Sequence, residues 1–496
     1  MAEESWHAAR LIPTSGINGA EAQARRATSA LLAVMSAVKE FGSAVTKSMG
    51  APAGTVETFI EVPFEVGERR VFPDGLIRVT RGKRTWVALV EVKTQSNELG
   101  AAQLEDYLDV ARAEGFDALL TISNELAPIP GVHPTTVDRR KLRKVTMHHL
   151  SWTEIMTIAV MQKVHRGVAD PDQAWILGEL IRYLEHPRSG AMGFEDMGED
   201  WVTVRNAIDA GTFRPTDKGG ARVASRWDQL VRYACLTHGQ TLGVEVQPAL
   251  SRKEQLDPLL ANQTLVASLA ANGRLERDIK IVGAVAPLTL GADLRAQKVT
   301  CSLMIDAPKD GRALTRVNWL LRQLKDAPES LRIDTFAVNG RTVGASELLR
   351  DVRENPSVLI VDPSKEFRAF RLVLSAPMGT KRGRGRGSFI GSVLGVLETF
   401  YETTAQSLKP WSPSAPKVRP VPESIEEEAR EQGVDTSLVS TAASSQDLAE
   451  SEPRAPMRGA TFDVRPATAE RPDAVGSMAS PGGSGPLSPL PPATSD

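Results

Sequence analysis

The chain has 496 residues, of which 59 are Lys or Arg and 61 are Asp or Glu, and its formal net charge is −2. A hydrophobic share of 41% is sufficient for cores of Leu, Val, Ile and Ala, whereas two cysteines, Cys235 and Cys301, exclude a disulfide scaffold and a zinc site made of cysteines. The first residues lack the pattern of a signal peptide and no apolar run approaches the length of a membrane span, so we expect a cytoplasmic protein without a membrane segment.

Residues 20–186 have the pattern of an α/β module. Apolar residues at spacings of three and four predict a helix over residues 20–48. Apolar runs bounded by turns predict five strands, at residues 58–64, 71–80, 85–93, 117–123 and 144–150. A helix capped by Ser96 or Asn97 and ended by Gly115 is expected between the third and fourth strands, and two more helices at residues 153–165 and 171–186. This order predicts helices packed on a small mixed sheet, in a domain spanning residues 15–190.

Residues 192–408 are predicted to form a separate α+β domain. Helices are expected at residues 223–236, 316–324 and 388–407, and strands at residues 357–362 and 369–375. Three Asx-Gly pairs indicate hairpins or tight connections, and they are Asn272-Gly273, Asp310-Gly311 and Asn339-Gly340. We found no motif that assigns a role to this domain.

The last segment, residues 411–496, differs in composition from the rest of the chain. It holds 13 of the 32 prolines, with 13 acidic and 7 basic residues, so it carries a charge of −6 while residues 1–410 carry +4. Such a segment cannot bury enough apolar surface to offset the entropy of ordering, and we expect a disordered tail. The overall charge therefore does not exclude a nucleic-acid partner for the folded part.

One set of polar residues lies at the ends of two predicted strands. Pro73-Asp74 opens the second strand, and Glu91-Val92-Lys93 closes the third. Glu91 and Lys93 lie two residues apart, so they point to the same face of the sheet. Asp74 lies on the neighbouring strand, so the two carboxylates can converge, and with the Val92 carbonyl they would form an all-oxygen site for Mg²⁺ or Mn²⁺. Lys93 would hold an attacking water or stabilise developing negative charge.

The following helix carries two further polar residues of interest. Gln103 and Tyr107 are four residues apart and therefore face the same way, toward Lys93 or toward a phosphate backbone. Tyr107 would fit equally well as an aromatic residue of the core.

The segments Pro73-Asp74 and Glu91-Val92-Lys93, separated by 16 residues, resemble the signature of the PD-(D/E)XK nuclease superfamily. The run Gln103-Leu104-Glu105-Asp106-Tyr107 resembles the QhxxY motif of its RecB-like branch, in which h is an apolar residue. The resemblance covers about a third of the chain, residues 15–155. It implies a restriction-endonuclease-like αβββαβ core, with Asp74 and Glu91 as metal ligands, Lys93 as the catalytic lysine and Gln103 and Tyr107 as supporting residues. Many members also place a glutamate of the first helix near the metal, and Glu21, or less readily Glu40, would take that place.

Two basic segments are candidates for nucleic-acid contacts. One precedes the fifth predicted strand and contains Arg139, Arg140 and Lys141. The other precedes the closing helix and contains Lys381, Arg382, Arg384 and Arg386, interleaved with glycines. Solvated loops of an arginine-rich protein would show the same pattern.

The sequence thus predicts a metal-dependent nuclease acting on DNA, in repair or in defence against foreign DNA. The alternative is a catalytically silent domain of the same fold that binds nucleic acid or protein partners in a stress response. A third alternative is a structural regulator whose similarity is accidental. A protein partner would bind through the central domain or the tail.

Overall fold

The computed structural model describes residues 7–8, 11, 20–66, 69–127, 129, 131–338, 340 and 342–413. The chain divides into two compact units, Met1–Ser414 and Ala415–Asp496. Both predicted folded domains belong to the first unit, and the predicted tail lies outside the described residues except for residues 411–413. Among the helices of the described part, none has both the length and the apolar character needed to span a membrane.

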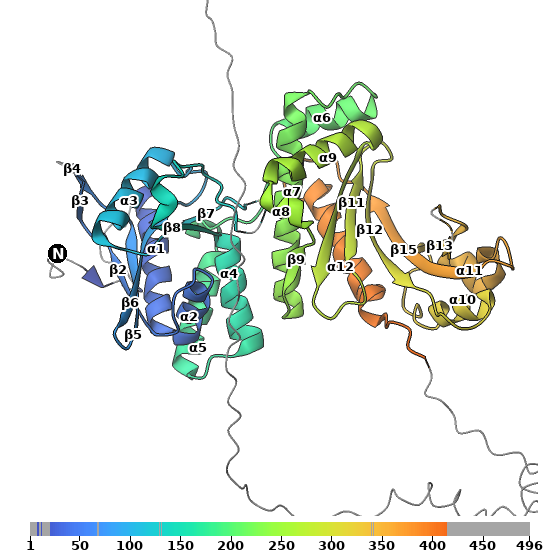
Figure 1. The fold of residues 1–496 in the computed structure, drawn as a ribbon, viewed down its shortest axis with the longest axis horizontal. Helices are drawn as coiled ribbons and strands as arrows, with labels where there is room; N and C mark the ends of the chain where they lie inside the picture. Colours follow the sequence, from blue (N-terminus) through green and yellow to red (C-terminus); the bar gives the residue numbers. More distant parts are fainter. Residues whose placement is uncertain are drawn as a thin grey trace, which may run out of the picture. The chain divides into compact units, whose positions relative to one another are not determined.

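A six-stranded mixed sheet forms the framework of the N-terminal part (Figure 1), with the strand order β1-β2-β5-β6-β7-β8. The strands are β1 (His7–Ala8), β2 (Thr55–Ile60), β5 (Gly75–Arg81), β6 (Arg84–Val92), β7 (Ala118–Ser123) and β8 (Thr146–Ser151). The neighbours from β1 to β6 are antiparallel, whereas β6, β7 and β8 run parallel. The mixed α/β character that the sequence predicts is therefore confirmed.

Different helices cover the two faces of this sheet. Helices α1 (Ala20–Ala37), α2 (Lys39–Lys47), α4 (Trp152–Val160) and α5 (Pro171–Glu185) share one apolar core with Val90 and Val92 of β6. Helix α3 (Ala101–Glu114) packs on the opposite face, against Leu89 of β6, Leu119 of β7 and the two-stranded sheet of β3 (Phe64–Val66) and β4 (Arg69–Val71). Since side chains alternate along a strand, Glu91 lies on the face covered by α3.

A seven-stranded antiparallel sheet organises the central part, in the order β14-β13-β15-β12-β11-β10-β9. Its strands are β9 (Val246–Pro248), β10 (Arg274–Ile281), β11 (Leu288–Asp293), β12 (Lys298–Asp306), β13 (Arg332–Ala337), β14 (Ser346–Leu348) and β15 (Phe367–Pro377). The helices of this part are α6 (Asp200–Asp209), α7 (Lys218–Leu242), α8 (Arg252–Leu256), α9 (Pro258–Asn272), α10 (Ala313–Leu321), α11 (Leu349–Glu354) and α12 (Phe389–Thr403). The long helix α7 and the closing helix α12 contribute to one large apolar core with these strands, and Trp201, Trp227 and Phe389 are fully buried in it.

Several predicted elements differ from those observed. The long first helix is interrupted at Val38, whose extended backbone (φ −105°, ψ 96°) separates α1 from α2. Neither Ser96 nor Asn97 caps α3, since the helix begins after Gly100. The strand predicted at residues 357–362 is wrong, because Pro356–Leu359 form a 3₁₀ turn. At Gly273, where a hairpin or a tight connection is predicted, the structure has the tight connection: Gly273 ends α9 with a left-handed conformation (φ 69°), and β10 begins at the next residue.

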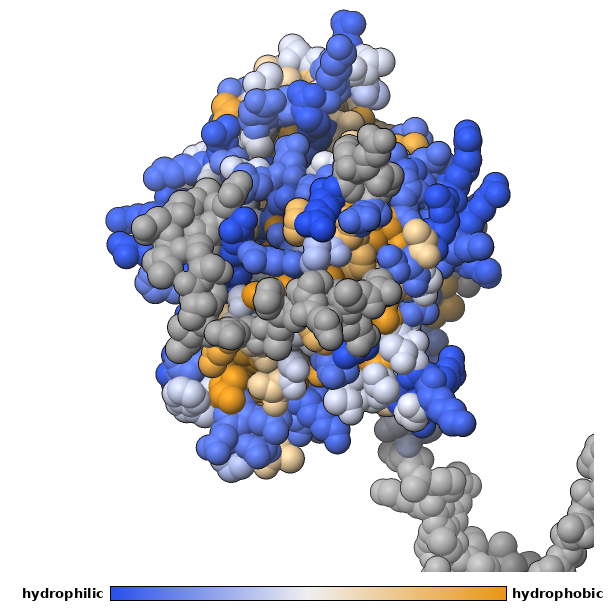
Figure 2. All heavy atoms as spheres, turned by 90° about the vertical axis from the view of Figure 1, so that its left-hand side faces the viewer, coloured by the Kyte–Doolittle hydropathy of each residue, from blue (hydrophilic) through white to orange (hydrophobic). Residues whose placement is uncertain are grey.

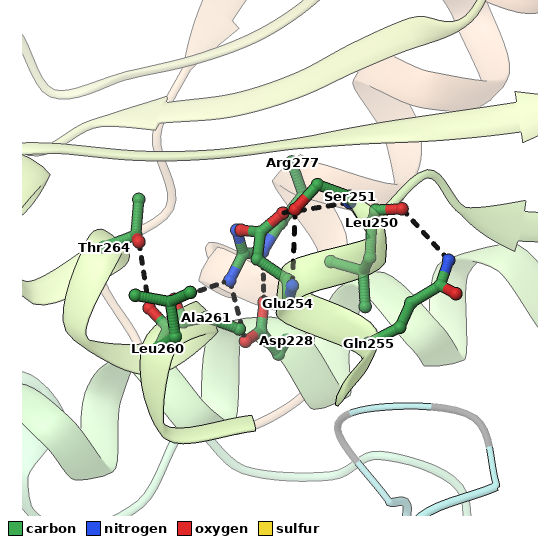
Figure 3. A network of polar contacts seen from close by, with 9 residues as sticks. All are labelled: Asp228, Leu250, Ser251, Glu254, Gln255, Leu260, Ala261, Thr264 and Arg277. Atoms are coloured by element: carbon green, nitrogen blue, oxygen red, sulfur yellow. Dashed lines mark hydrogen bonds and ion pairs between the residues drawn. The ribbon is translucent and has the colours of Figure 1, made fainter. Parts of the chain in front are cut away.

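The face of the molecule in Figure 2 is dominated by hydrophilic side chains, with smaller groups of hydrophobic ones between them. Some charged side chains are nevertheless buried inside the central part. The clearest case is Arg277 of β10, which is 8% exposed. Its guanidinium donates to both carboxylate oxygens of Asp228 in α7 (2.6 and 3.2 Å) and to Glu254 of α8 (3.1 Å). It also donates to the Ala261 carbonyl oxygen of α9 (2.9 Å), so one side chain connects four elements (Figure 3).

Replacing Arg277 by Met is expected to lower the free energy of unfolding by about 3–5 kcal/mol, because Asp228 would remain buried without its cation. Urea denaturation of the full chain measures this change. Arg182→Met is the matched control, since the ion pair between Arg182 and Glu179 is largely exposed, and it should cost less than about 1 kcal/mol. Equal denaturation midpoints for the two variants would contradict this role of Arg277.

Candidate active site

Asp74 immediately precedes β5, and the sheet register places it beside the end of β6. Gly75 is paired with Val90, so the next position along each strand brings Asp74 level with Glu91. The Asp74 Oδ2 atom accepts a hydrogen bond from the Val92 backbone N–H at 2.8 Å. The Asp74 side chain thereby continues the hydrogen bonding between β5 and β6 past the last backbone pair.

Glu91 and Lys93 form an ion pair at the end of β6. The Lys93 ammonium lies 2.6 Å from Glu91 Oε1, while Glu91 itself is only 1% exposed. The backbone of Lys93 is held on both sides, since its N–H donates to the Ile122 carbonyl of β7 (2.7 Å) and its carbonyl accepts from the Trp152 indole (2.9 Å). The predicted convergence of Glu91 and Lys93 on one face is therefore observed.

The second carboxylate oxygen of Glu91, Oε2, is buried and accepts no hydrogen bond. The Asp74 and Glu91 carboxyl groups lie close enough to influence each other's pKa. Burial raises the pKa of Glu91 to about 7, with the charge of Asp74 as the second cause, and burial also raises the pKa of Asp74. Two adjacent carboxylates repel each other when both are charged. The Lys93 ammonium, with Arg25 nearby, supplies part of the compensating charge, and a shared proton or a bound cation would supply the rest.

Gln103 and Tyr107 of α3 face the same region, as their spacing predicts. The Gln103 amide donates to the Tyr107 hydroxyl (2.9 Å), which in turn donates to the Phe72 carbonyl oxygen (3.3 Å). Tyr107 is 4% exposed and packs in the apolar core beneath α3, so it is both a core aromatic residue and a neighbour of the site. Burial, followed by the charge of Glu91, raises the pKa of its hydroxyl.

The first helix contributes a cation to this region. Glu21 lies within α1, but its side chain lies outside the described residues. Glu40 belongs to α2 and accepts a hydrogen bond from the Ala169 N–H (3.1 Å), which gives it a structural contact before α5. Arg25 of α1 lies near enough to Asp74 to lower the pKa of that carboxyl, and it also pairs with Glu61 (3.7 Å).

The first basic segment lies at the opposite end of the sheet from the carboxylates. Residues 139–144 lead into the start of β8, whereas Glu91 lies near the end of the parallel strand β6. Lys141 is ion-paired with Asp109 of α3 (2.7 Å), and Arg140 lies near Asp138 (3.8 Å). The structure therefore does not bring Arg139, Arg140 and Lys141 together with Asp74 and Glu91.

The second basic segment is tied to an acidic stretch of the chain. Arg382 pairs with Asp196 (3.2 Å), and Arg384 pairs with Glu195 (3.2 Å). These are surface ion pairs, since the side chains of Arg382 and Arg384 are 50% and 43% exposed. The side chains of Lys381 and Arg386 are exposed.

A cluster of Thr121, His133 and His149 lies next to Glu91 and was not predicted from the sequence. Thr121 of β7 is paired in register with Glu91 on one side and with His149 of β8 on the other. In a parallel pair, neighbouring residues in register point to the same face, so these side chains form one row across the sheet. His133, from the loop after β7, places its Nε2 2.8 Å from the Thr121 hydroxyl.

The contacts of this cluster define the direction of its hydrogen bonds. His133 Nδ1 lies 3.0 Å from both the N–H and the carbonyl oxygen of Thr135, so Thr135 is compatible with either tautomer. When the Thr121 hydroxyl donates its proton to His149 Nδ1, His133 Nε2 carries a proton and donates it to Thr121. His149 Nε2 lies 2.9 Å from the Glu125 carbonyl oxygen and must donate to it. His149 Nδ1 therefore accepts from the Thr121 hydroxyl (2.9 Å). Both imidazoles are satisfied in the neutral form, in agreement with the burial that lowers their pKa values.

The donor set at Asp74 and Glu91 fits a hard divalent cation. Among the described residues, no group of three or more His, Cys, Asp or Glu side chains could hold a metal ion. Mg²⁺, however, commonly binds through one or two protein carboxylates and completes its shell with water and substrate phosphate oxygens. The buried, unpartnered Glu91 Oε2 beside a second carboxylate is compatible with that mode of binding.

Comparisons with protein-family models, with curated proteins and with solved structures find no match for this chain.

We expect His133→Gln to make the folded protein less sensitive to acid. The pKa of His133 is lowered to about 4 by burial and by His149, from 6.5 in the unfolded chain. Between these values the unfolded chain binds more protons than the folded one, so the free energy of unfolding falls as the pH decreases from 6.5 toward 4. The variant lacks this contribution. Urea denaturation at several pH values should therefore show a smaller decrease in its free energy of unfolding between pH 6.5 and 4 than in that of the wild type. The same pH dependence in both proteins would contradict a neutral His133.

Proposed function

We propose that this protein is a Mg²⁺-dependent nuclease that hydrolyses phosphodiester bonds of DNA. The observation that carries the proposal is the pair of adjacent carboxyl groups, Asp74 and Glu91, with an unpartnered buried oxygen and with Lys93 against it. Such a site is costly for stability, because a buried charged group without full compensation destabilises the folded state. A catalytic role would explain why it is present.

The arrangement of the elements supports the same proposal. Helix α1, strands β2, β5 and β6, helix α3 and strand β7 occur in the order that the PD-(D/E)XK resemblance implies, with α2 and the β3–β4 pair as additional elements between them. Asp74, Glu91 and Lys93 lie at one end of neighbouring strands, and Tyr107 of α3 lies near Glu91. These are the positions to which the resemblance assigns the metal ligands, the lysine and the supporting residues.

The side chains present define the roles in this reaction. Asp74 and Glu91 would hold the cation, and Asp74 is oriented for this by the Val92 N–H. When bound, Mg²⁺ supplies polarisation of a phosphoryl oxygen and a lowered pKa of its water. Lys93 is 24% exposed in its side chain, so its ammonium can contact both Glu91 and a substrate oxygen, where it would orient the attacking water or stabilise negative charge.

Asp74→Ala and Lys93→Ala are each expected to reduce metal-dependent cleavage of plasmid and linear DNA by about a hundredfold or more, because each removes a group that acts on the reacting phosphate. Gel assays with the purified full chain in MgCl₂ or MnCl₂ measure this loss. Lys39→Ala, a change of an exposed lysine on α2, should cleave like the wild type.

Cleavage that survives both active-site substitutions would show that the site is assigned wrongly. If the wild type cleaves neither DNA nor RNA and binds neither Mg²⁺ nor Mn²⁺, the chain is better explained as a catalytically silent binding domain.

Mg²⁺ is expected to raise the melting temperature of the wild type at pH 8, and the increase should become smaller as the pH falls below about 7. The pKa of Glu91 is about 7, so protons compete with the cation for this carboxylate below that pH. Thermal unfolding with and without MgCl₂ over this pH range tests the expectation. Asp74→Ala should lose the stabilisation by Mg²⁺ at every pH, and an equal response of the two proteins would place the cation elsewhere.

A further inference from the structure

Phe72 is an exposed aromatic side chain two residues before Asp74. It is 54% exposed, although Pro73 beside it is buried and Asp74 is only partly exposed. Among the aromatic residues that the structure describes, Phe72 and Trp175 are the large ones left exposed. A single exposed apolar side chain is common on protein surfaces, so exposure alone assigns no role to Phe72. The relevant feature is its position two residues from Asp74.

The backbone around Phe72 is fixed by three contacts. Val71, the preceding residue, is paired with Phe64 in the β3–β4 sheet. The Phe72 carbonyl oxygen accepts the hydrogen bond from Tyr107 (3.3 Å), and the Asp74 carboxylate is bonded to the Val92 N–H (2.8 Å). The phenyl ring is therefore presented on a rigid support that α3 and β6 share with the carboxylates.

The short distance along the chain keeps the backbone of Phe72 close to that of Asp74. Two residues span at most about 7 Å between Cα atoms, so a nucleotide whose phosphate lies at Asp74 brings its own base, or that of its neighbour, within reach of Phe72. Aromatic side chains bind unpaired bases by stacking, and this contact tolerates any base because each has a π-face. In an intact duplex the base faces are already stacked on each other, so the ring has no face to bind.

We propose that Phe72 stacks on an unpaired nucleobase next to the scissile phosphate, and that single-stranded DNA is the preferred substrate class of the site. The inference rests on the proposed nuclease function and specifies its substrate. Stacking adds affinity for the nucleotide and leaves the chemical step to Asp74, Glu91 and Lys93. Removal of the ring should therefore affect KM more than kcat.

The test measures KM and kcat for cleavage of a fluorescein-labelled oligonucleotide by the full-length protein in MgCl₂. The oligonucleotide is supplied either single-stranded or annealed to its complement, and the two forms are compared. Phe72→Ala is expected to raise KM for the single strand about tenfold, which corresponds to the loss of one base-stacking contact. Phe72→Trp retains a stacking ring and should restore the wild-type KM. Trp175→Ala is the matched control, because it removes the other exposed aromatic residue, on α5, and should leave both KM and kcat unchanged.

The possible failures are distinguishable. A wild type that cleaves the duplex as readily as the single strand, or a Phe72→Ala variant with unchanged KM, overturns the inference and leaves the nuclease function standing. If the wild type cleaves neither form, the nuclease function fails, and fluorescence anisotropy of the same oligonucleotides then decides the inference. Weaker single-strand binding by Phe72→Ala supports it, and equal binding overturns it.

Discussion

The close approach of the Asp74 and Glu91 carboxyl groups is the constraint on which the candidate site depends. Burial raises the pKa of both carboxyl groups, and the charge of Asp74 raises the pKa of Glu91 further, whereas the contact with Glu91 lowers the pKa of Asp74. The ladder between β5 and β6 holds the two together, since the Asp74 carboxylate replaces a backbone carbonyl as the partner of the Val92 N–H. Apolar residues would stabilise the same fold better, so the pair indicates a requirement other than stability.

The surroundings of the pair are rigid because neighbouring elements bind its backbone. Lys93 is held between β7 and the Trp152 indole of α4. Behind it, Gly190 accepts hydrogen bonds from the Gln95 N–H (3.0 Å) and the Asn124 amide (2.8 Å). A Cβ atom at Gly190, whose φ is +81°, would lie 2.9 Å from both Gln23 and Thr94, so only glycine allows this close packing. The end of β6 is thus fixed from α1, from β7 and from the turn after α5.

The sequence is sufficient to predict β5, β6, β7 and β8 and the convergence of Glu91 with Lys93, because both follow from local alternation and apolar runs. It is not sufficient for the row that continues through Thr121 and His149. That row depends on the register of β6, β7 and β8, which tertiary packing determines and which no local pattern encodes. His133 joins the row from a loop, so its contact with Thr121 was also beyond prediction. The adjacent pair His148-His149 was a weak signal, since one of two successive strand residues must face α3.

The basic segments show why charge along a sequence is a poor guide to a binding surface. Lys141, Arg382 and Arg384 each meet an acidic partner of the same chain, so their positive charge is largely neutralised by Asp109, Asp196 and Glu195. Other basic residues of the two segments, among them Arg139, Lys381 and Arg386, are exposed, so part of the positive charge of residues 1–410 still lies there. A nucleic acid bound at Asp74 and Glu91 would depend mainly on contacts made there, by the cation, by Lys93 and by a base on Phe72. Affinity of this kind is governed by short-range geometry, which a rigid strand end can supply and which a flexible basic loop cannot.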